Sequence, residues 1–274
     1  MGSHALHTVG YSAVELAQSP YARFFSQQMR PLPDHVQQAV LVGGVSGELM
    51  PGLDAAGTLL HADDWLVETG YSICDDGEIR VSVLTLMPGV TPAMWDWWFA
   101  WHGSDSLRYK LWHPRAHVHA VWGDNRSDLT HYVGRTSHIV EYIGSSKISG
   151  AISFMPPASI GIDESRLAAS GATAICARTG LEFPQLDAGW LVHYVRPMAG
   201  GSEMRSRFWM GGGFISPRGM DTTIGKAIGR GIGQIAGPTS GQARDLLVHC
   251  AQEMNHLAAI LPDIYAAFGP QASL

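Results

Sequence analysis

Alternating apolar and polar residues dominate the chain after residue 62 and predict antiparallel β-strands. The stretch YSICDDGEIRVSVLTLM holds two such runs around Asp75, Asp76 and Gly77, which is typical of a β-hairpin. Further runs of this kind are RYKLW, HVHAVW, SHIVEYI, TAICART, GWLVHYV and RSRFWM. Strands and helices do not alternate regularly, so the pattern argues against a doubly wound parallel sheet.

Two segments show a helical pattern instead. TPAMWDWWFAWH predicts a helix with Thr91 as N-cap and Pro92 in its first turn. Near the end of the chain, Thr239 or Ser240 can cap a long helix that runs to Leu261 and is stopped by Pro262. One apolar stripe follows this helix, formed by Ala243, Leu246, Leu247, Cys250, Met254, Leu257 and Leu261. Many antiparallel strands before one long helix predict an α+β helix-grip, in which a curved sheet wraps around the helix and leaves a cavity.

The first sixty residues show short helical patterns instead of alternating strands. YSAVELAQ, PYARFFSQQM and DHVQQAVLV predict short helical pieces broken by prolines, and LMPGLDAAGTL is typical of a linker. We therefore expect a small helical N-terminal domain over residues 1–62 and a larger domain over residues 63–274. The Gly-rich stretch from Gly225 to Gly237 lacks the strand that should precede a dinucleotide-binding loop, and it favours a mobile loop over the cavity.

Composition narrows the classes of partner. The chain has 274 residues, of which 46% are hydrophobic, which is enough for a sizeable core. The net charge is −6 and no run of Lys or Arg occurs, so a nucleic acid or an anionic membrane is not an expected partner. No apolar stretch reaches membrane-spanning length, and the N-terminus lacks the pattern of a signal peptide. The three widely spaced cysteines indicate free thiols in a reducing cytoplasm.

The long C-terminal helix carries candidate metal ligands. His249 and Glu253 are four residues apart, so they share one helix face, and they border the apolar stripe. A His and a carboxylate at this spacing can chelate one cation. The alternative is a half-buried pair that only supports the helix. His256 lies on the same side, and we assign it to the surroundings of the site or to the surface.

Further candidates lie on the predicted strands. WHPRAHVHAVW contains His113, His117 and His119, and in a regular strand the last two would share one face. Glu141 shares a strand face with two isoleucines, a position that costs several kcal/mol unless the carboxylate is paired or bound to metal. The alternative is an edge position in solvent. His193 also faces inward, either as a hydrogen-bonded core residue or as a general acid or base.

Several of these motifs together resemble the 2,4-diacetylphloroglucinol hydrolase family, to which phloretin hydrolase is related. They are MPGVTPAMWDWWFAWHGSDSLRYKLWHPRAHVHA, VEYIG and VHCAQEMNHL, and the resemblance extends from about Leu84 to Leu261. It implies a Bet v 1-like catalytic domain, a homodimer and a zinc-dependent hydrolase. Such an enzyme cleaves the aryl–ketone carbon–carbon bond of an acylated phloroglucinol and releases a carboxylic acid and the deacylated phenol.

The resemblance also implies roles for individual residues. The zinc ligands would be His117, Glu141, His249 and Glu253, with His119 as the rival for the first position. Tyr109 and His193 match positions that contact the substrate. Two residues depart from the family pattern, because Ala120 stands where an Asn is expected and Phe208 stands where a Tyr is expected in the substrate site. Both departures concern the identity of the substrate more than the metal.

These roles suggest a mechanism and its rivals. After protonation of the ring carbon that bears the acyl group, water attacks the carbonyl and a retro-Claisen cleavage follows. His193 would be a second base or the proton donor, Tyr109 would hold a phenol hydroxyl or the carbonyl, and the Trp-rich helix would either line the cavity or pack in the core. One alternative is a carrier that binds a hydrophobic aromatic ligand without turnover, and another is a metal-free enzyme using His193 with a carboxylate. The residues do not distinguish an acetyl from a phenylpropanoyl substrate, zinc from another divalent ion, or one dimer surface from another.

Overall fold

The computed structural model describes residues 8–61, 64–128, 130–220 and 239–270. Within these residues, nine strands form one antiparallel sheet in the order β1-β2-β8-β7-β6-β5-β4-β3, and β9 pairs with β7. The strands are β1 (Gly70–Ile73), β2 (Glu78–Pro88), β3 (His117–Trp122), β4 (Thr136–Ile143), β5 (Ser146–Met155), β6 (Thr173–Leu181), β7 (Leu186–Met198), β8 (Gly201–Gly211) and β9 (Ser216–Pro217).

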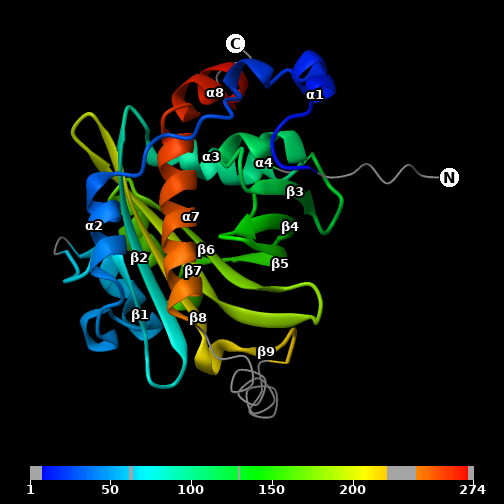
Figure 1. The fold of residues 1–274 in the computed structure, drawn as a ribbon. Helices are drawn as coiled ribbons and strands as arrows, with labels where there is room; N and C mark the ends of the chain where they lie inside the picture. Colours follow the sequence, from blue (N-terminus) through cyan, green and yellow to red (C-terminus); the bar gives the residue numbers. More distant parts are fainter. Residues whose placement is uncertain (1–7, 62–63, 129, 221–238, 271–274) are drawn as a thin grey trace.

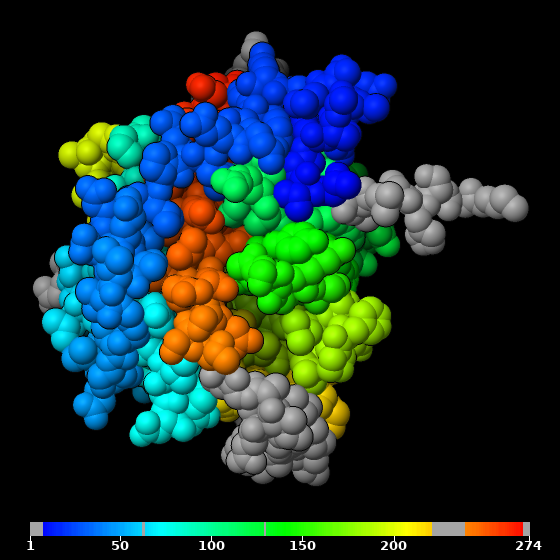
Figure 2. All heavy atoms as spheres, viewed as in Figure 1, coloured from blue at the N-terminus to red at the C-terminus, as the bar shows by residue number. Residues whose placement is uncertain are grey.

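One long helix lies in the curve of this sheet (Figure 1). The α-helices are α1 (Ala13–Gln18), α2 (Asp34–Val42), α3 (Pro92–His102), α4 (Ser106–Trp112), α5 (Glu164–Ala169), α7 (Ser240–Ala258) and α8 (Leu261–Phe268). The 3-10 turns are η1 (Ala22–Phe24), η2 (Gly47–Leu49), η3 (Leu53–Leu60), η4 (Pro157–Ile160) and η5 (Gly212–Phe214). The long helix is α7, so the predicted α+β helix-grip is confirmed. Figure 2 shows part of α7 at the surface, between the N-terminal segment and the β3–β5 strands.

Turn and helix-capping residues in the sequence predicted the position of several elements correctly. The hairpin β1–β2 turns at Asp75 to Gly77, and Thr91 caps α3 by accepting a hydrogen bond from the Met94 backbone N–H. Thr239 caps α7 in a capping box with Gln242. This helix ends at Ala258 rather than at Leu261, because the chain bends and Pro262 enters the first turn of α8.

Other predicted elements were wrong. RYKLW belongs to helix α4, which begins after Asp105, whose side chain accepts a hydrogen bond from the Leu107 backbone N–H. A segment this short fits either the helical or the strand period, and here the helix cap at Asp105 decides between them. The presumed linker instead contains η3, which buries Ala56 and Leu59. The predicted helical piece within PYARFFSQQM does form, as the 3-10 turn η1. The stretch from residue 225 to 237, which was predicted to be a loop, lies outside the described residues.

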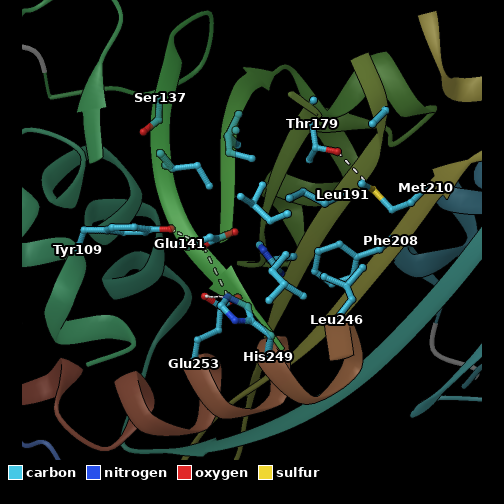
Figure 3. A pocket seen from close by; sticks show the side chains of 18 of the residues that line it. Tyr109, Ser137, Glu141, Thr179, Leu191, Phe208, Met210, Leu246, His249 and Glu253 are labelled. Atoms are coloured by element: carbon cyan, nitrogen blue, oxygen red, sulfur yellow. Dashed lines mark hydrogen bonds and ion pairs between the residues drawn. The ribbon is translucent and has the colours of Figure 1, made fainter. Parts of the chain in front are cut away.

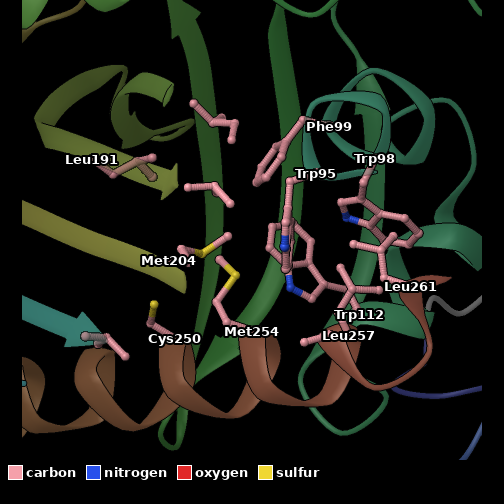
Figure 4. Packing of buried hydrophobic residues seen from close by; sticks show 14 of the residues in the cluster. Trp95, Trp98, Phe99, Trp112, Leu191, Met204, Cys250, Met254, Leu257 and Leu261 are labelled. Carbon is pink, nitrogen blue, oxygen red and sulfur yellow. The ribbon is translucent and has the colours of Figure 1, made fainter. Parts of the chain in front are cut away.

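The core lies between α7, the sheet and α3. Figure 4 shows Trp95, Trp98 and Trp112 packed above the apolar side of α7 and the start of α8. The stripe is confirmed by the buried residues Ala243, Leu247, Cys250, Met254 and Leu257. Tyr11, Tyr21 and Val36 belong to the same core cluster, and the division into units of 1–62 and 63–274 stays a prediction. Among the described residues, no helix has the length and apolarity needed to cross a bilayer.

Candidate metal centre and substrate cavity

A cavity of about 250 Å³ lies between α7 and the inner face of strands β4 to β8. Most of its lining is apolar, and Glu141 of β4 lies close to His249 and Glu253 of α7 on one side of the cavity (Figure 3). The lining includes Phe99, His102, Tyr109, Trp112, Ser137, Ile139, Glu141, Ile143, Ile148, Gly150, Ile152, Phe154, Thr179, Leu181, Leu191, His193, Phe208, Met210, Leu246, His249 and Glu253. Such a chamber suits a hydrophobic small molecule that carries a few polar groups.

Three buried residues form a close ligand group. One ligand atom each from His117, His249 and Glu253 lies within 4.8 Å of the others, so the group could hold a metal ion. His249 and Glu253 come from successive turns of α7, as their spacing predicted, and His117 comes from the start of β3. Glu253 Oε2 lies 3.3 Å from His117 Nε2 and 3.8 Å from His249 Nε2.

Glu141 adds a second carboxylate from β4. Its Oε2 lies 3.3 Å from His117 Nε2 and 3.6 Å from His249 Nε2, so it points at the ligand group rather than into solvent. Burial alone would raise the pKa of Glu141, but the two histidines outweigh it and hold this pKa well below its ordinary value. For His117, burial opposes protonation, yet the two carboxylates raise its pKa to about 9. The cluster therefore favours a positive charge at its centre.

A β-bulge separates the two rival histidines. His117 pairs with Glu141, whereas His119 pairs with Val140, so one extra residue, Val118, shifts the register between them. Cross-strand partners share a face, which places His117 on the side of Glu141 and turns His119 away. The expectation that both histidines share one face was therefore wrong. His119 Nδ1 instead lies 2.7 Å from Ser106 Oγ.

Tyr109 holds two members of the cluster at once. Its hydroxyl donates to Glu141 Oε2 at 2.5 Å, and its backbone carbonyl accepts from His117 Nδ1 at 3.0 Å. Its ring also stacks on the His117 ring, with centroids 3.8 Å apart. Because a carbonyl can only accept, His117 Nδ1 carries the proton, which leaves Nε2 as the atom that faces the carboxylates. Burial and Glu141 raise the pKa of Tyr109 well above its ordinary value, so it remains a donor.

His193 and Phe208 line another wall of the cavity. His193 is buried on β7, where its Nδ1 lies 2.8 Å from Ser206 Oγ and its ring contacts Phe208 and Phe99. Burial lowers the pKa of His193 to about 3, so this imidazole is neutral at ordinary pH. His193 faces inward, as its strand pattern predicted, and Phe208, which the resemblance assigns to substrate binding, lines the same cavity. Sequence reasoning missed Ser206, whose position opposite His193 on β8 is a tertiary feature.

The structure also decides between alternatives that the sequence left open. Trp95, Trp97, Trp98 and Trp101 do not line the cavity, and from that helix Phe99 and His102 do. His256 is buried rather than exposed, and it lies outside the close ligand group. His113, a further candidate from the sequence, stacks its ring on His249 with centroids 5.0 Å apart, and its Nε2 lies 3.3 Å from Gln252 Oε1.

The donor set can be tested against a tetrahedral metal ion. Bonds of about 2.0–2.2 Å to four ligands place neighbouring ligand atoms about 3.3–3.6 Å apart. The four His–Glu separations here are 3.3, 3.3, 3.6 and 3.8 Å. Among the described residues, His117 Nε2 has no partner with hydrogen-bond geometry, although two carboxylate oxygens surround it. The residues therefore fit a divalent ion with nitrogen and oxygen ligands.

This chain is similar to a family model and to known proteins over most of its length. Residues 49–266 match the family model described as DAPG hydrolase PhiG domain. The chain is 30% identical over 267 residues to a 2,4-diacetylphloroglucinol hydrolase of a Pseudomonas species, covering 93% of this chain and 90% of that protein. It is 32% identical over 262 residues to phloretin hydrolase of Eubacterium ramulus, covering 90% of this chain and 89% of that protein.

Two solved structures align with this chain at low sequence identity and low TM-score. Ara h 8.0201 aligns with a TM-score of 0.30 at 12% identity, covering 63% of this chain and 99% of that chain. Protein CV1439 from Chromobacterium violaceum aligns with a TM-score of 0.36 at 13% identity, covering 67% of this chain and 97% of that chain. The fold assignment itself rests on the sheet order and on α7.

Proposed function

As this chain belongs to the DAPG hydrolase family, we propose that it hydrolyses the aryl–ketone carbon–carbon bond of acylated phloroglucinols at a zinc centre. The observation that carries the proposal is the convergence of two histidines and two carboxylates on one side of an apolar cavity. The family fixes the class of reaction, and the cavity suits an aromatic ketone. We further propose that the protein is a cytoplasmic homodimer.

The proposed ligands are His117, Glu141, His249 and Glu253. When bound, zinc would acidify a water molecule and polarise an oxygen of the substrate. The two carboxylates would neutralise the charge of the ion, so an additional base in the cavity would assist the reaction. Tyr109 would keep His117 and Glu141 in place, which is a different role from the direct substrate contact that the resemblance implies.

The cavity residues supply the rest of the chemistry. The walls formed by Phe99, Trp112 and Phe208 would bind the electron-rich ring and exclude bulk water. Protonation of the ring carbon that bears the acyl group gives a β-diketone. Attack of water on the carbonyl then breaks the carbon–carbon bond, and its electron pair leaves as an enolate. The net change is addition of one water molecule, which yields a carboxylic acid and the deacylated phenol.

His193 is the proposed proton-transfer residue. Its Nδ1 lies next to Ser206 and its ring lines the cavity, so the imidazole is placed to accept a proton from water or to pass one to the ring carbon. Phe208 offers no hydroxyl where the family pattern has a Tyr, and Ala120 replaces an expected Asn. We therefore expect a substrate with fewer hydrogen bonds to its ring substituents, and both acetyl and phenylpropanoyl ketones should be assayed.

The test is release of acid from defined ketones. Zinc-loaded protein is incubated with 2,4-diacetylphloroglucinol or phloretin, and the acid and phenol products are separated and quantified. Turnover that disappears in Glu253→Gln and persists in His119→Asn supports the proposal. Binding without release of acid would identify a carrier, and turnover that survives removal of the metal by a strong chelator would favour metal-free chemistry.

A further inference from the structure

Helix α4 has two faces with different partners. Its inner face carries Tyr109, which holds Glu141 through its hydroxyl and His117 through its carbonyl and ring. The position of this helix therefore sets the position of two proposed ligands. A helix of seven residues is too short to be stable by itself, so contacts from outside must hold it.

The outer face of α4 is held by the N-terminal segment. The Tyr11 hydroxyl donates to the Leu107 carbonyl at 2.6 Å, and Arg108 Nε donates to the Tyr21 hydroxyl at 2.8 Å. A third contact joins the same segments, because Lys110 Nζ donates to Glu15 Oε1 at 3.0 Å. These contacts bind three residues of α4 to three residues that lie about ninety positions earlier in the chain.

Among these contacts, the Lys110–Glu15 pair is the one that would cost most to break, because it involves a buried charge. The Lys110 side chain is only 4% exposed, whereas that of Glu15 is 29% exposed. A buried ammonium without its partner is strongly unfavourable, so Lys110 requires Glu15 nearby. Glu15 is itself fixed, because its other oxygen accepts the Ser12 backbone N–H in the capping box of α1.

We propose that residues 11–21 form a clamp that positions α4, and through Tyr109 the ligands His117 and Glu141. This proposal rests on one part of the proposed function, which is that His117 and Glu141 bind the metal. Tyr11, Glu15 and Tyr21 are positioning residues, since none of them lines the cavity. The N-terminal segment thus acquires a role in metal binding in addition to its packing in the core.

Zinc affinity tests the clamp. Metal-stripped protein is titrated with zinc in competition with a chromophoric chelator, for the unmodified chain and for Lys110→Met, Glu15→Gln and Tyr11→Phe. By analogy with residues that orient metal ligands, we expect zinc binding to weaken about 10-fold or more in the first two variants, and less in Tyr11→Phe. Lys110→Arg, which keeps a positive charge near Glu15, should bind zinc almost as tightly as the unmodified chain.

The control breaks an equivalent pair elsewhere. Glu78→Gln removes the half-buried Glu78–Arg80 pair, whose atoms are 2.8 Å apart and which does not touch α4. It should lower stability without changing zinc affinity. Unchanged zinc affinity in Lys110→Met and Glu15→Gln would overturn the clamp. If those two variants do not fold, unchanged zinc affinity in Tyr11→Phe would overturn it instead. Failure of the unmodified chain to bind zinc would instead overturn the proposed function.

Discussion

Replacement of Tyr109 by Phe separates a residue that positions ligands from one that only contacts substrate. The variant keeps the ring stacked on His117 and the backbone carbonyl that accepts from His117 Nδ1. It removes only the hydroxyl that donates to Glu141 at 2.5 Å. A hydrogen bond to a charged group contributes about 1.5–3 kcal/mol. If most of that energy supports the metal-bound state, zinc affinity should fall about 10- to 100-fold.

The assay is competition for zinc against a chromophoric chelator, followed by kinetics at saturating zinc. Tyr132→Phe is the matched control, because the Tyr132 hydroxyl donates to Asp96 Oδ1 at 2.7 Å in a buried position outside the cavity. That variant should lose stability and keep its zinc affinity. Unchanged zinc affinity in Tyr109→Phe, with only a higher KM, would refute the positioning role and return Tyr109 to substrate binding.

Three further outcomes follow from the site. The folded pKa of His193, about 3, is lower than the unfolded value of about 6.5, so the unfolded chain binds the proton first and stability falls as pH drops below about 6.5. Between pH 7 and pH 5 this group should remove about 2 kcal/mol, and His193→Gln should abolish that part of the loss in urea denaturation. Phe208→Tyr should lower the KM of hydroxylated ketones about 3- to 10-fold by adding one hydrogen bond, and an unchanged KM would place that wall away from the ring hydroxyls. His119→Asn should leave zinc affinity within about twofold, since His119 faces Ser106, and a large loss would reverse the assignment of His117.

Much of the fold could be predicted because its signals are local. The hairpin at Asp75 to Gly77 and the caps at Thr91 and Thr239 depend on neighbouring residues, and the structure places them as expected. RYKLW was misjudged because a five-residue segment is too short to distinguish the helical period from the strand period. The helix cap at Asp105 was the signal that could have decided it.

In the candidate site too, features set by neighbouring residues could be predicted, and features set by tertiary packing could not. The spacing of His249 and Glu253 is a property of one helix, so the sequence was sufficient to pair them. The choice between His117 and His119 depends on a bulge in the pairing of β3 with β4, which no local pattern reveals. The double contact of Tyr109 with His117 and Glu141 also joins segments far apart in sequence, and it emerges only when α4 packs against the sheet.

The most direct measurement is acid release during a zinc titration of metal-stripped protein. If His117, Glu141, His249 and Glu253 form a catalytic zinc site, hydrolysis of 2,4-diacetylphloroglucinol or phloretin should rise with added zinc and level off at one ion per chain. The same titration of Glu253→Gln should stay near the background. Full turnover before any zinc is added, or no acid from either ketone at any zinc concentration, would contradict a zinc-dependent carbon–carbon hydrolase.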